Sequence, residues 1–196
     1  MFIELTDHLR CPEDHVEQYL VLLPDRIEDR SVREGWLGCP VCGRTFRVED
    51  GALDLGGASP PESATETALS AEAVAALAGV NGPGGYLVLV GGPGAAWRAV
   101  AEQVSRVGLV AVNPGPAIRD EAGVSVIRAG RLPLKSRSMR GVVLGAPYGG
   151  DSRWVAEAAR TVLPGLRVVG EGAEPSADVI EVMATAGPVW VGSPRR

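Results

Sequence analysis

Seven short apolar runs, rich in β-branched residues, recur from Tyr86 onward and constrain the fold more than any other feature of the chain. They cover residues 86–90, 108–112, 124–128, 141–145, 166–170, 179–183 and 188–192. Runs that are apolar on both faces are typical of a parallel sheet covered on both sides. Between the first two runs, apolar side chains recur at helical spacing, at Ala96, Val100, Val104 and Val107. We therefore predict an α/β fold with a truncated Rossmann-like, mostly parallel sheet of about seven strands.

Composition and charge exclude several other classes of protein. Of 196 residues, 45% are hydrophobic and 22% are charged, which is typical of a globular chain. No apolar run approaches the roughly 18 residues that span a membrane, and the N-terminus lacks a signal-peptide core. We expect a cytoplasmic protein that does not bind a membrane. The first 55 residues carry 12 acidic and 6 basic side chains, so nucleic-acid binding is not indicated there.

Composition also divides the chain into three parts. Residues 1–55 contain all three cysteines and predict a small first domain. Residues 56–83 predict a linker, rich in Gly, Pro, Ser and Thr, that ends in a short helix capped by Ser70. Residues 84–196 contain the seven apolar runs and predict the Rossmann-like domain. The linker composition favours separate cores for the first and third parts.

The cysteines predict a metal site in the first part. Three cysteines in a chain of intracellular type indicate metal ligation more readily than disulfides. A Cys-x2-Cys pair followed by glycine lets two thiolates converge on one ion, and an earlier Cys-x3-His pair offers a thiolate and an imidazole. The predicted ligands of a structural zinc are Cys11, His15, Cys39 and Cys42. Asp14 and His8 are alternative fourth ligands, although a neutral imidazole suits zinc better than a lone carboxylate. The alternative to a metal site is three buried or free cysteines beside an exposed histidine.

The same residues carry a resemblance to a known family. The segments that carry it are Leu9-Arg-Cys11-Pro, Gly38-Cys39-Pro-Val-Cys42-Gly and the pattern from Phe46 to Leu55. Together they resemble the zinc-ribbon family that includes the small activator subunit of tRNA and protein methyltransferases. The family usually has a second cysteine in the first knuckle, where this chain has Asp14 and His15. The resemblance implies a zinc ribbon that can pair with a methyltransferase.

Residues 84–196 resemble class I S-adenosylmethionine-dependent methyltransferases. The first apolar run ends in Gly91-Gly92-Pro93-Gly94, which matches the family's glycine-rich turn at the cofactor. Asn113 follows the second run, where the family has an acid that binds the ribose, and Ala129 follows the third run, at the adenine. The positions that the resemblance assigns to the cofactor are Gly92, Gly94, Asn113 and Ala129.

The acids of that family are missing from this chain. The positions where the family has an acid are occupied by Val88, Asn113, Arg128 and Arg140. The loop Gly145-Ala-Pro147-Tyr148 lacks the asparagine of amino-group methyltransferases. Each lost charged hydrogen bond costs about 1.5–3 kcal/mol, and two arginines beside the cofactor would repel its sulfonium. We therefore expect zinc as the cofactor and no bound S-adenosylmethionine.

These residues predict a non-catalytic protein. The only histidines are His8 and His15, and all cysteines belong to the predicted zinc site, so a Ser-His-Asp or Cys-His set is excluded. We predict a zinc-binding scaffold or regulatory protein with a degenerate methyltransferase-like domain, a pseudoenzyme that acts through a protein partner. One alternative is an active S-adenosylmethionine-dependent methyltransferase that uses Asn113 and backbone amides. The other is an activator subunit of a separate methyltransferase.

Overall fold

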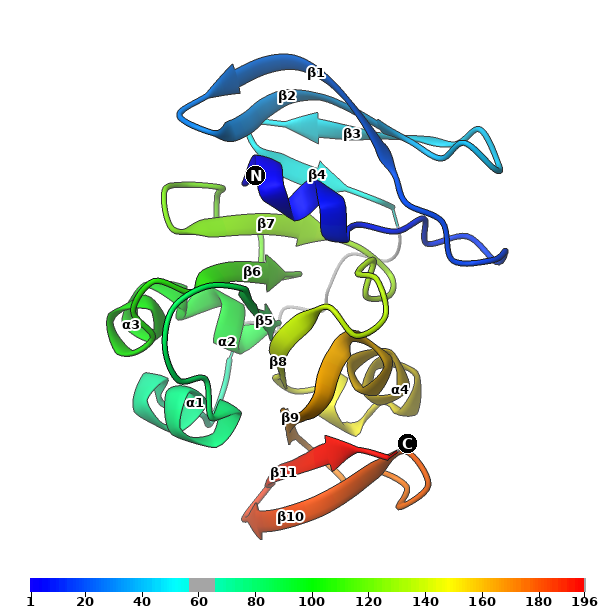
Figure 1. The fold of residues 1–196 in the computed structure, drawn as a ribbon. Coiled ribbons are helices and arrows are strands. Elements are labelled where there is room, and N and C mark those ends of the chain that lie inside the picture. The colour runs from blue at the N-terminus through cyan, green and yellow to red at the C-terminus, as the bar shows by residue number, and fades with distance from the viewer. Residues whose placement is uncertain (57–65, 196) are drawn as a thin grey trace.

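The computed structural model describes residues 1–56 and 66–195 as a mixed α/β fold around one large sheet (Figure 1). Residues 57–65 of the expected linker lie outside the described residues. The strands are β1 (Val21–Glu28), β2 (Ser31–Gly38), β3 (Thr45–Glu49), β4 (Ala52–Asp54), β5 (Tyr86–Val90), β6 (Gly108–Val112), β7 (Val124–Arg128), β8 (Met139–Leu144), β9 (Val162–Glu171), β10 (Ile180–Ala186) and β11 (Val189–Pro194). The helices are η1 (Ile3–His8), α1 (Ala71–Ala78), α2 (Gly92–Ala95), α3 (Trp97–Gln103), η3 (Tyr148–Gly150) and α4 (Ser152–Thr161).

The sheet has 11 strands in the order β1-β2-β3-β4-β7-β6-β5-β8-β9-β11-β10. Each of the seven apolar runs forms a strand, from β5 to β11, and the five central strands β7-β6-β5-β8-β9 are parallel. Strand β11 is antiparallel to both β9 and β10. The expected total of about seven strands is wrong, because β1–β4 of the N-terminal part belong to the same sheet.

The two parts of the chain join at β4 and β7. These strands pair in parallel, with Leu53 opposite Ile127 and Asp54 opposite Arg128. The N–H of Leu55 donates to the carbonyl oxygen of Arg128 at 2.9 Å. The antiparallel strands β1–β4 therefore extend the parallel sheet at its β7 side (Figure 1).

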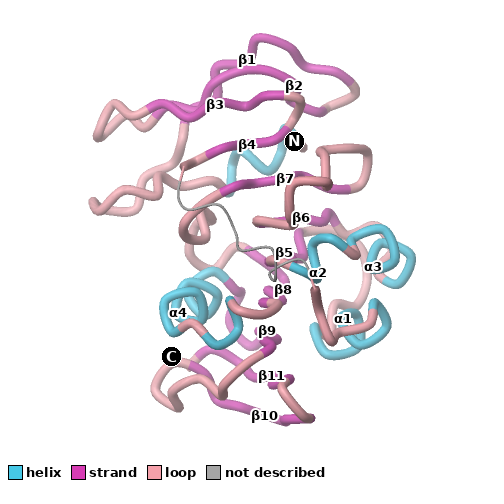
Figure 2. The backbone as a smooth tube through the Cα atoms, turned by 180° about the vertical axis from the view of Figure 1, so that it is seen from behind, coloured by secondary structure: helices cyan, strands magenta, loops and turns pink. Residues whose placement is uncertain are grey.

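Side chains of the central strands alternate between two faces, and each face is covered by helices. Val88 and Val90 of β5 belong to one hydrophobic cluster, whereas Leu87 and Leu89 belong to the other. The first cluster includes side chains of η1 and α4, and the second includes side chains of α1 and α3. Figure 2 shows α4 on one side of the sheet and α1, α2 and α3 on the other. This arrangement is the two-sided cover that apolar parallel strands require.

The N-terminal and C-terminal parts share one of these cores. The first cluster contains Leu9 and Leu37 from the N-terminal part together with Val110 and Trp154 from the C-terminal part. The expectation of separate cores is thus replaced by a common core on this face. The boundaries after residues 55 and 83 stay a prediction.

Helices α1 and α4 each begin at a residue whose side chain caps the helix. Ser70 Oγ accepts a hydrogen bond from the N–H of Ala73 at the start of α1, and Gly79 ends that helix with a φ of 62°. Asp151 accepts a hydrogen bond from the N–H of Arg153 at the start of α4. In residues 1–56 and 66–195, none of the helices combines the length and the apolar character that crossing a membrane requires.

Candidate metal centre and cofactor edge

Two loops of the N-terminal part bring the predicted metal ligands together. Cys39 directly follows β2, and the N–H of Gly43 donates to its carbonyl oxygen at 2.9 Å, which folds Cys42 back beside it. Gly43 has a φ of 71°, a conformation that glycine adopts without strain. Cys11 lies in the loop after η1, and its N–H donates to the carbonyl oxygen of Gln18 at 2.9 Å. Backbone hydrogen bonds therefore hold both loops in place.

Two distances within the group of four side chains match those around a tetrahedral zinc ion. One ligand atom from each of Cys11, His15, Cys39 and Cys42 lies within 4.8 Å of all the others. The sulfurs of Cys11 and Cys42 are 3.7 Å apart, and the Cys39 sulfur is 3.5 Å from His15 Nε2. With Zn–S near 2.3 Å and Zn–N near 2.0 Å, tetrahedral geometry gives an S–S distance of about 3.8 Å and an S–N distance of about 3.5 Å. The group can hold a metal ion, and its chemistry is that of a zinc site.

The side chains of this group differ in how readily they lose a proton. His15 Nδ1 donates to the carbonyl oxygen of Val16 at 2.7 Å, so the lone pair of Nε2 is directed to the thiols. Burial works to raise the pKa of the Cys39 thiol, but the backbone N–H groups of Cys42 and Val41 lower that pKa to about 7. Burial raises the pKa of Cys11 to about 12. Of these two thiols, Cys39 is thus the one that ionises first.

The two alternative fourth ligands lie elsewhere. Asp14 forms an ion pair with Arg131 at 3.0 Å and its side chain is 96% exposed. The His8 ring packs edge-on against Tyr86, with 5.4 Å between the ring centroids. Neither side chain belongs to the group of four, so the geometry selects His15.

The loop that carries Cys11 and His15 also contacts the C-terminal part of the chain. Arg10, next to Cys11, donates to Glu157 of α4 at 3.2 Å. The carboxylate of Glu17 accepts hydrogen bonds from the backbone and the hydroxyl of Ser136, the latter at 2.7 Å. The loop that carries two metal ligands is therefore fixed to the C-terminal part by charged and polar contacts.

The glycines assigned to the cofactor lie at the carboxyl end of β5, in α2. A Cβ added to Gly92 would collide with the carbonyl oxygen of Glu66. A Cβ added to Gly94 would lie 3.0 Å from the carbonyl oxygen of Leu89 and 3.1 Å from the side chain of Pro114. Close packing of the chain against itself thus accounts for both glycines.

Asn113 and Ala129 bind each other at the ends of β6 and β7. The side-chain amide of Asn113 donates to the Ala129 carbonyl oxygen at 2.8 Å, and the Ala129 N–H donates to Asn113 Oδ1 at 3.0 Å. Asn113 is 4% exposed and Ala129 is 3% exposed. Both polar groups that the resemblance assigns to ribose and adenine are therefore already paired.

The two arginines that replace acids of the family lie at opposite ends of the parallel strands. Arg140, near the start of β8, donates to the carbonyl oxygens of Gly82 and Gly84 at 2.9 and 2.7 Å, and also to those of Asn81 and Pro83. This residue organises the loop before β5, so its expected place beside the cofactor is wrong. Arg128 ends β7 and lines a cavity of about 740 Å³ with Arg119 and Trp36.

Sequence reasoning missed one buried polar residue at the carboxyl edge. Glu171 ends β9, is 3% exposed, and accepts hydrogen bonds from residues 67–69 and from Ala146. The available signal is a single acid directly after the apolar run 166–170. An acid at a strand end is common at a solvated turn, so this signal does not by itself reveal burial.

Comparisons with known proteins find similarity only among solved structures. No protein-family model matches the chain, and no curated protein matches its sequence. One chain of the complex between the Haloferax volcanii Trm112 methyltransferase activator and a methyltransferase matches at 22% identity and a TM-score of 0.42, over 51% of this chain and 50% of that chain. An S-adenosylmethionine-dependent methyltransferase from Mesorhizobium loti matches at 20% identity and a TM-score of 0.36, over 62% of this chain and 64% of that one.

A third solved structure matches over more of the chain. Spermidine synthase from Thermotoga maritima is 9% identical with a TM-score of 0.38, and the match covers 94% of this chain and 76% of the synthase. The chain spans half of the Haloferax chain and less than two thirds of the Mesorhizobium enzyme. A function for this protein therefore has to be argued from its own residues.

Proposed function

We propose that this protein is a non-catalytic, zinc-binding scaffold or regulatory protein in which a zinc ribbon and a degenerate methyltransferase-like domain form one sheet. Residues 1–55 are the ribbon, 56–83 the linker with its short helix, and 84–196 the methyltransferase-like domain. The supporting features are the four-residue metal group and the self-paired polar groups at the cofactor edge.

The reciprocal pair of Asn113 and Ala129 is the observation that carries the proposal. A cofactor that accepted a hydrogen bond from the Ala129 N–H would have to break the 3.0 Å hydrogen bond between that N–H and Asn113 Oδ1. The buried side-chain amide of Asn113 would then need a new partner. Leaving a buried donor or acceptor unsatisfied costs about 1–3 kcal/mol. Because no acid stands at position 88, 113 or 128, the chain offers no carboxylate at these positions to offset that cost.

Zinc in this proposal is a structural ion. Cys11, His15, Cys39 and Cys42 supply four protein ligands, and a structural site is one in which the protein fills all four positions. When bound, the ion would hold the loop of Cys11 and His15 onto the knuckle that follows β2. The ion has no open position for a substrate in this arrangement.

We propose that a protein partner binds this molecule. Large apolar side chains are exposed on the metal-binding part: Val16 is 82% exposed, Leu23 59% and Val41 55%. Val16 and Val41 are next in sequence to the metal ligands His15 and Cys42. Exposed apolar side chains that gather on one part of a surface favour protein contacts.

Calorimetric titration of metal-analysed protein with S-adenosylmethionine and with S-adenosylhomocysteine tests the proposal. The expected Kd is weaker than about 1 mM for both compounds. A micromolar Kd for either compound would contradict the proposal and would favour the active methyltransferase. Catalysis would then have to be tested directly.

A further inference from the structure

The carboxylate of Glu171 lies in a cage of hydrogen-bond donors. One oxygen, Oε1, accepts from Thr67 Oγ1 at 2.7 Å, from the N–H of Ala68 at 2.6 Å and from the N–H of Leu69 at 2.9 Å. The other oxygen, Oε2, accepts from the N–H of Ala146 at 3.1 Å. In residues 1–56 and 66–195, no cationic side chain forms an ion pair with this carboxylate. Backbone and hydroxyl donors alone therefore satisfy a buried charge, as in an anion-binding site.

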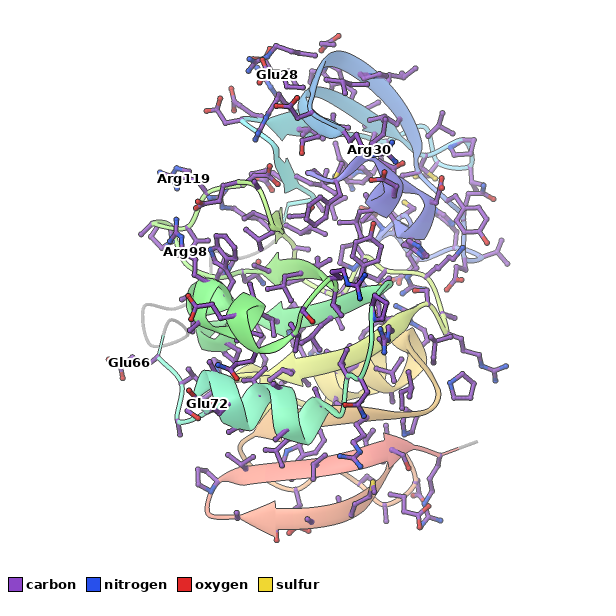
Figure 3. The ribbon with its side chains drawn as sticks, turned by 60° about the vertical axis from the view of Figure 1, so that its left-hand side comes forward. Glu28, Arg30, Glu66, Glu72, Arg98 and Arg119 are labelled. Atoms are coloured by element: carbon purple, nitrogen blue, oxygen red, sulfur yellow. The ribbon has the colours of Figure 1, made fainter. Side chains whose placement is uncertain are left out.

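The segment that supplies most of these donors lies on the glycine-rich turn. A Cβ added to Gly92 would collide with the Glu66 carbonyl oxygen and would lie 3.0 Å from Thr67 Cβ. The Glu66 side chain points outward at the surface near α1, so its backbone, not its carboxylate, makes the contact (Figure 3). Leu69 is 5% exposed and belongs to the hydrophobic cluster on the α1 face. The segment is thus held both by burial and by Glu171.

We propose that residues 66–69 are a built-in occupant of the glycine-rich turn and that Glu171 is the latch that holds them there. The donors to the Glu171 carboxylate come from two segments that are distant in the sequence, residues 67–69 and Ala146, so this carboxylate links them. A ligand at this turn would have to displace the segment first. This inference rests on the proposed non-catalytic function. It adds a second place, besides Asn113, where the chain itself occupies groups that a cofactor would need.

Two structural roles close to Glu171 do not require its side chain. The N–H groups of Ala68 and Leu69 precede Ser70, which caps α1 with its own side chain, so Glu171 is not needed as the cap. The backbone of Glu171 is already paired in the sheet, opposite Val189 of β11. The side chain therefore acts on the 66–69 segment and on Ala146, in the loop after β8, rather than on the strand that carries it.

Hydrogen exchange of the full-length protein tests the latch. In the Glu171→Gly variant, exchange of the Ala68 and Leu69 amides and of the turn at residues 92–94 should rise at least about tenfold. Sodium formate should restore protection in this variant, whereas sodium chloride at the same ionic strength should not. The matched control is Glu174→Gly, three residues on at an exposed position, which should change neither readout.

A second variant keeps the test decisive if Glu171→Gly does not fold. Glu171→Gln retains the volume and one acceptor oxygen but turns an NH2 group toward donors, so exchange should rise less and formate should have no effect. Unchanged exchange at residues 67–69 in both variants would overturn the latch, as would a uniform rise over the whole chain or a failure of formate in a folded Glu171→Gly variant. Micromolar binding of S-adenosylmethionine by the wild type, with the latch results as expected, would overturn the proposed function alone.

Discussion

Replacing Asn113 by alanine tests how much the reciprocal pair contributes to stability. The change removes two hydrogen bonds, of 2.8 and 3.0 Å, and leaves the N–H and the C=O of Ala129 without their partner. Both residues are less than 5% exposed, so water does not readily replace the lost side chain. The two unsatisfied groups cost about 2–6 kcal/mol together.

The backbone adds a second contribution at this position. Asn113 has a φ of 51°, which asparagine tolerates better than alanine does, at a difference of about 1 kcal/mol. The expected total for Asn113→Ala is about 3–7 kcal/mol, a large share of the 5–15 kcal/mol that is typical of a folded protein. Asn113→Gly should cost about 1 kcal/mol less, since glycine adopts positive φ freely.

Urea unfolding of zinc-loaded protein, followed by circular dichroism, measures these losses. The matched control is Asn81→Ala, since Asn81 is the other asparagine of the chain and is exposed. It should change the free energy of unfolding by less than about 0.5 kcal/mol. A loss below about 1 kcal/mol for Asn113→Ala would refute the reasoning, because two buried unpaired groups cannot cost so little.

Three further changes test other parts of the structure. Cys39→Ser should reduce bound zinc well below one equivalent and lower the stability of both parts in a single transition, since they share a core; two separate transitions would contradict this. Arg140→Met should lower the free energy of unfolding by about 1 kcal/mol and speed amide exchange in residues 81–84, and unchanged exchange there would count against it. Burial raises the pKa of Tyr86 to about 12, so the folded state holds the phenol proton more tightly than the unfolded state does. Stability from this residue should be complete below about pH 10 and fall between about pH 10 and 12, and Tyr86→Phe should lack that fall in urea midpoints.

Local sequence patterns predicted what depends on local chemistry. The seven apolar runs became β5–β11 because two-sided apolar character fits a covered parallel sheet. The Ser70 cap lies where its side chain can reach the backbone of its own helix. The four metal ligands converge because short loops on both sides fix their thiols and imidazole, and this convergence was predictable from their spacing.

Contacts between distant segments were not predictable in the same way. The pairing of β4 with β7 uses backbone groups of a three-residue strand, which leave no side-chain pattern to read. The partner of Asn113 is the backbone of a residue 16 positions later, and the donors for Glu171 come from a segment about 100 positions earlier. The role of Arg140 likewise depends on carbonyl oxygens of a loop that its own strand does not specify.

The pairing of Asn113 with Ala129 at the ends of β6 and β7 can be observed at these two residues. Nuclear magnetic resonance of uniformly ¹⁵N-labelled, zinc-loaded protein resolves the backbone amide of Ala129 and the side-chain amide of Asn113, with and without about 1 mM S-adenosylmethionine. We predict slow exchange of the Ala129 amide and unchanged chemical shifts of both groups on addition of the compound. A saturable shift of both signals, with loss of protection at Ala129, would contradict the central claim that these groups are committed to each other.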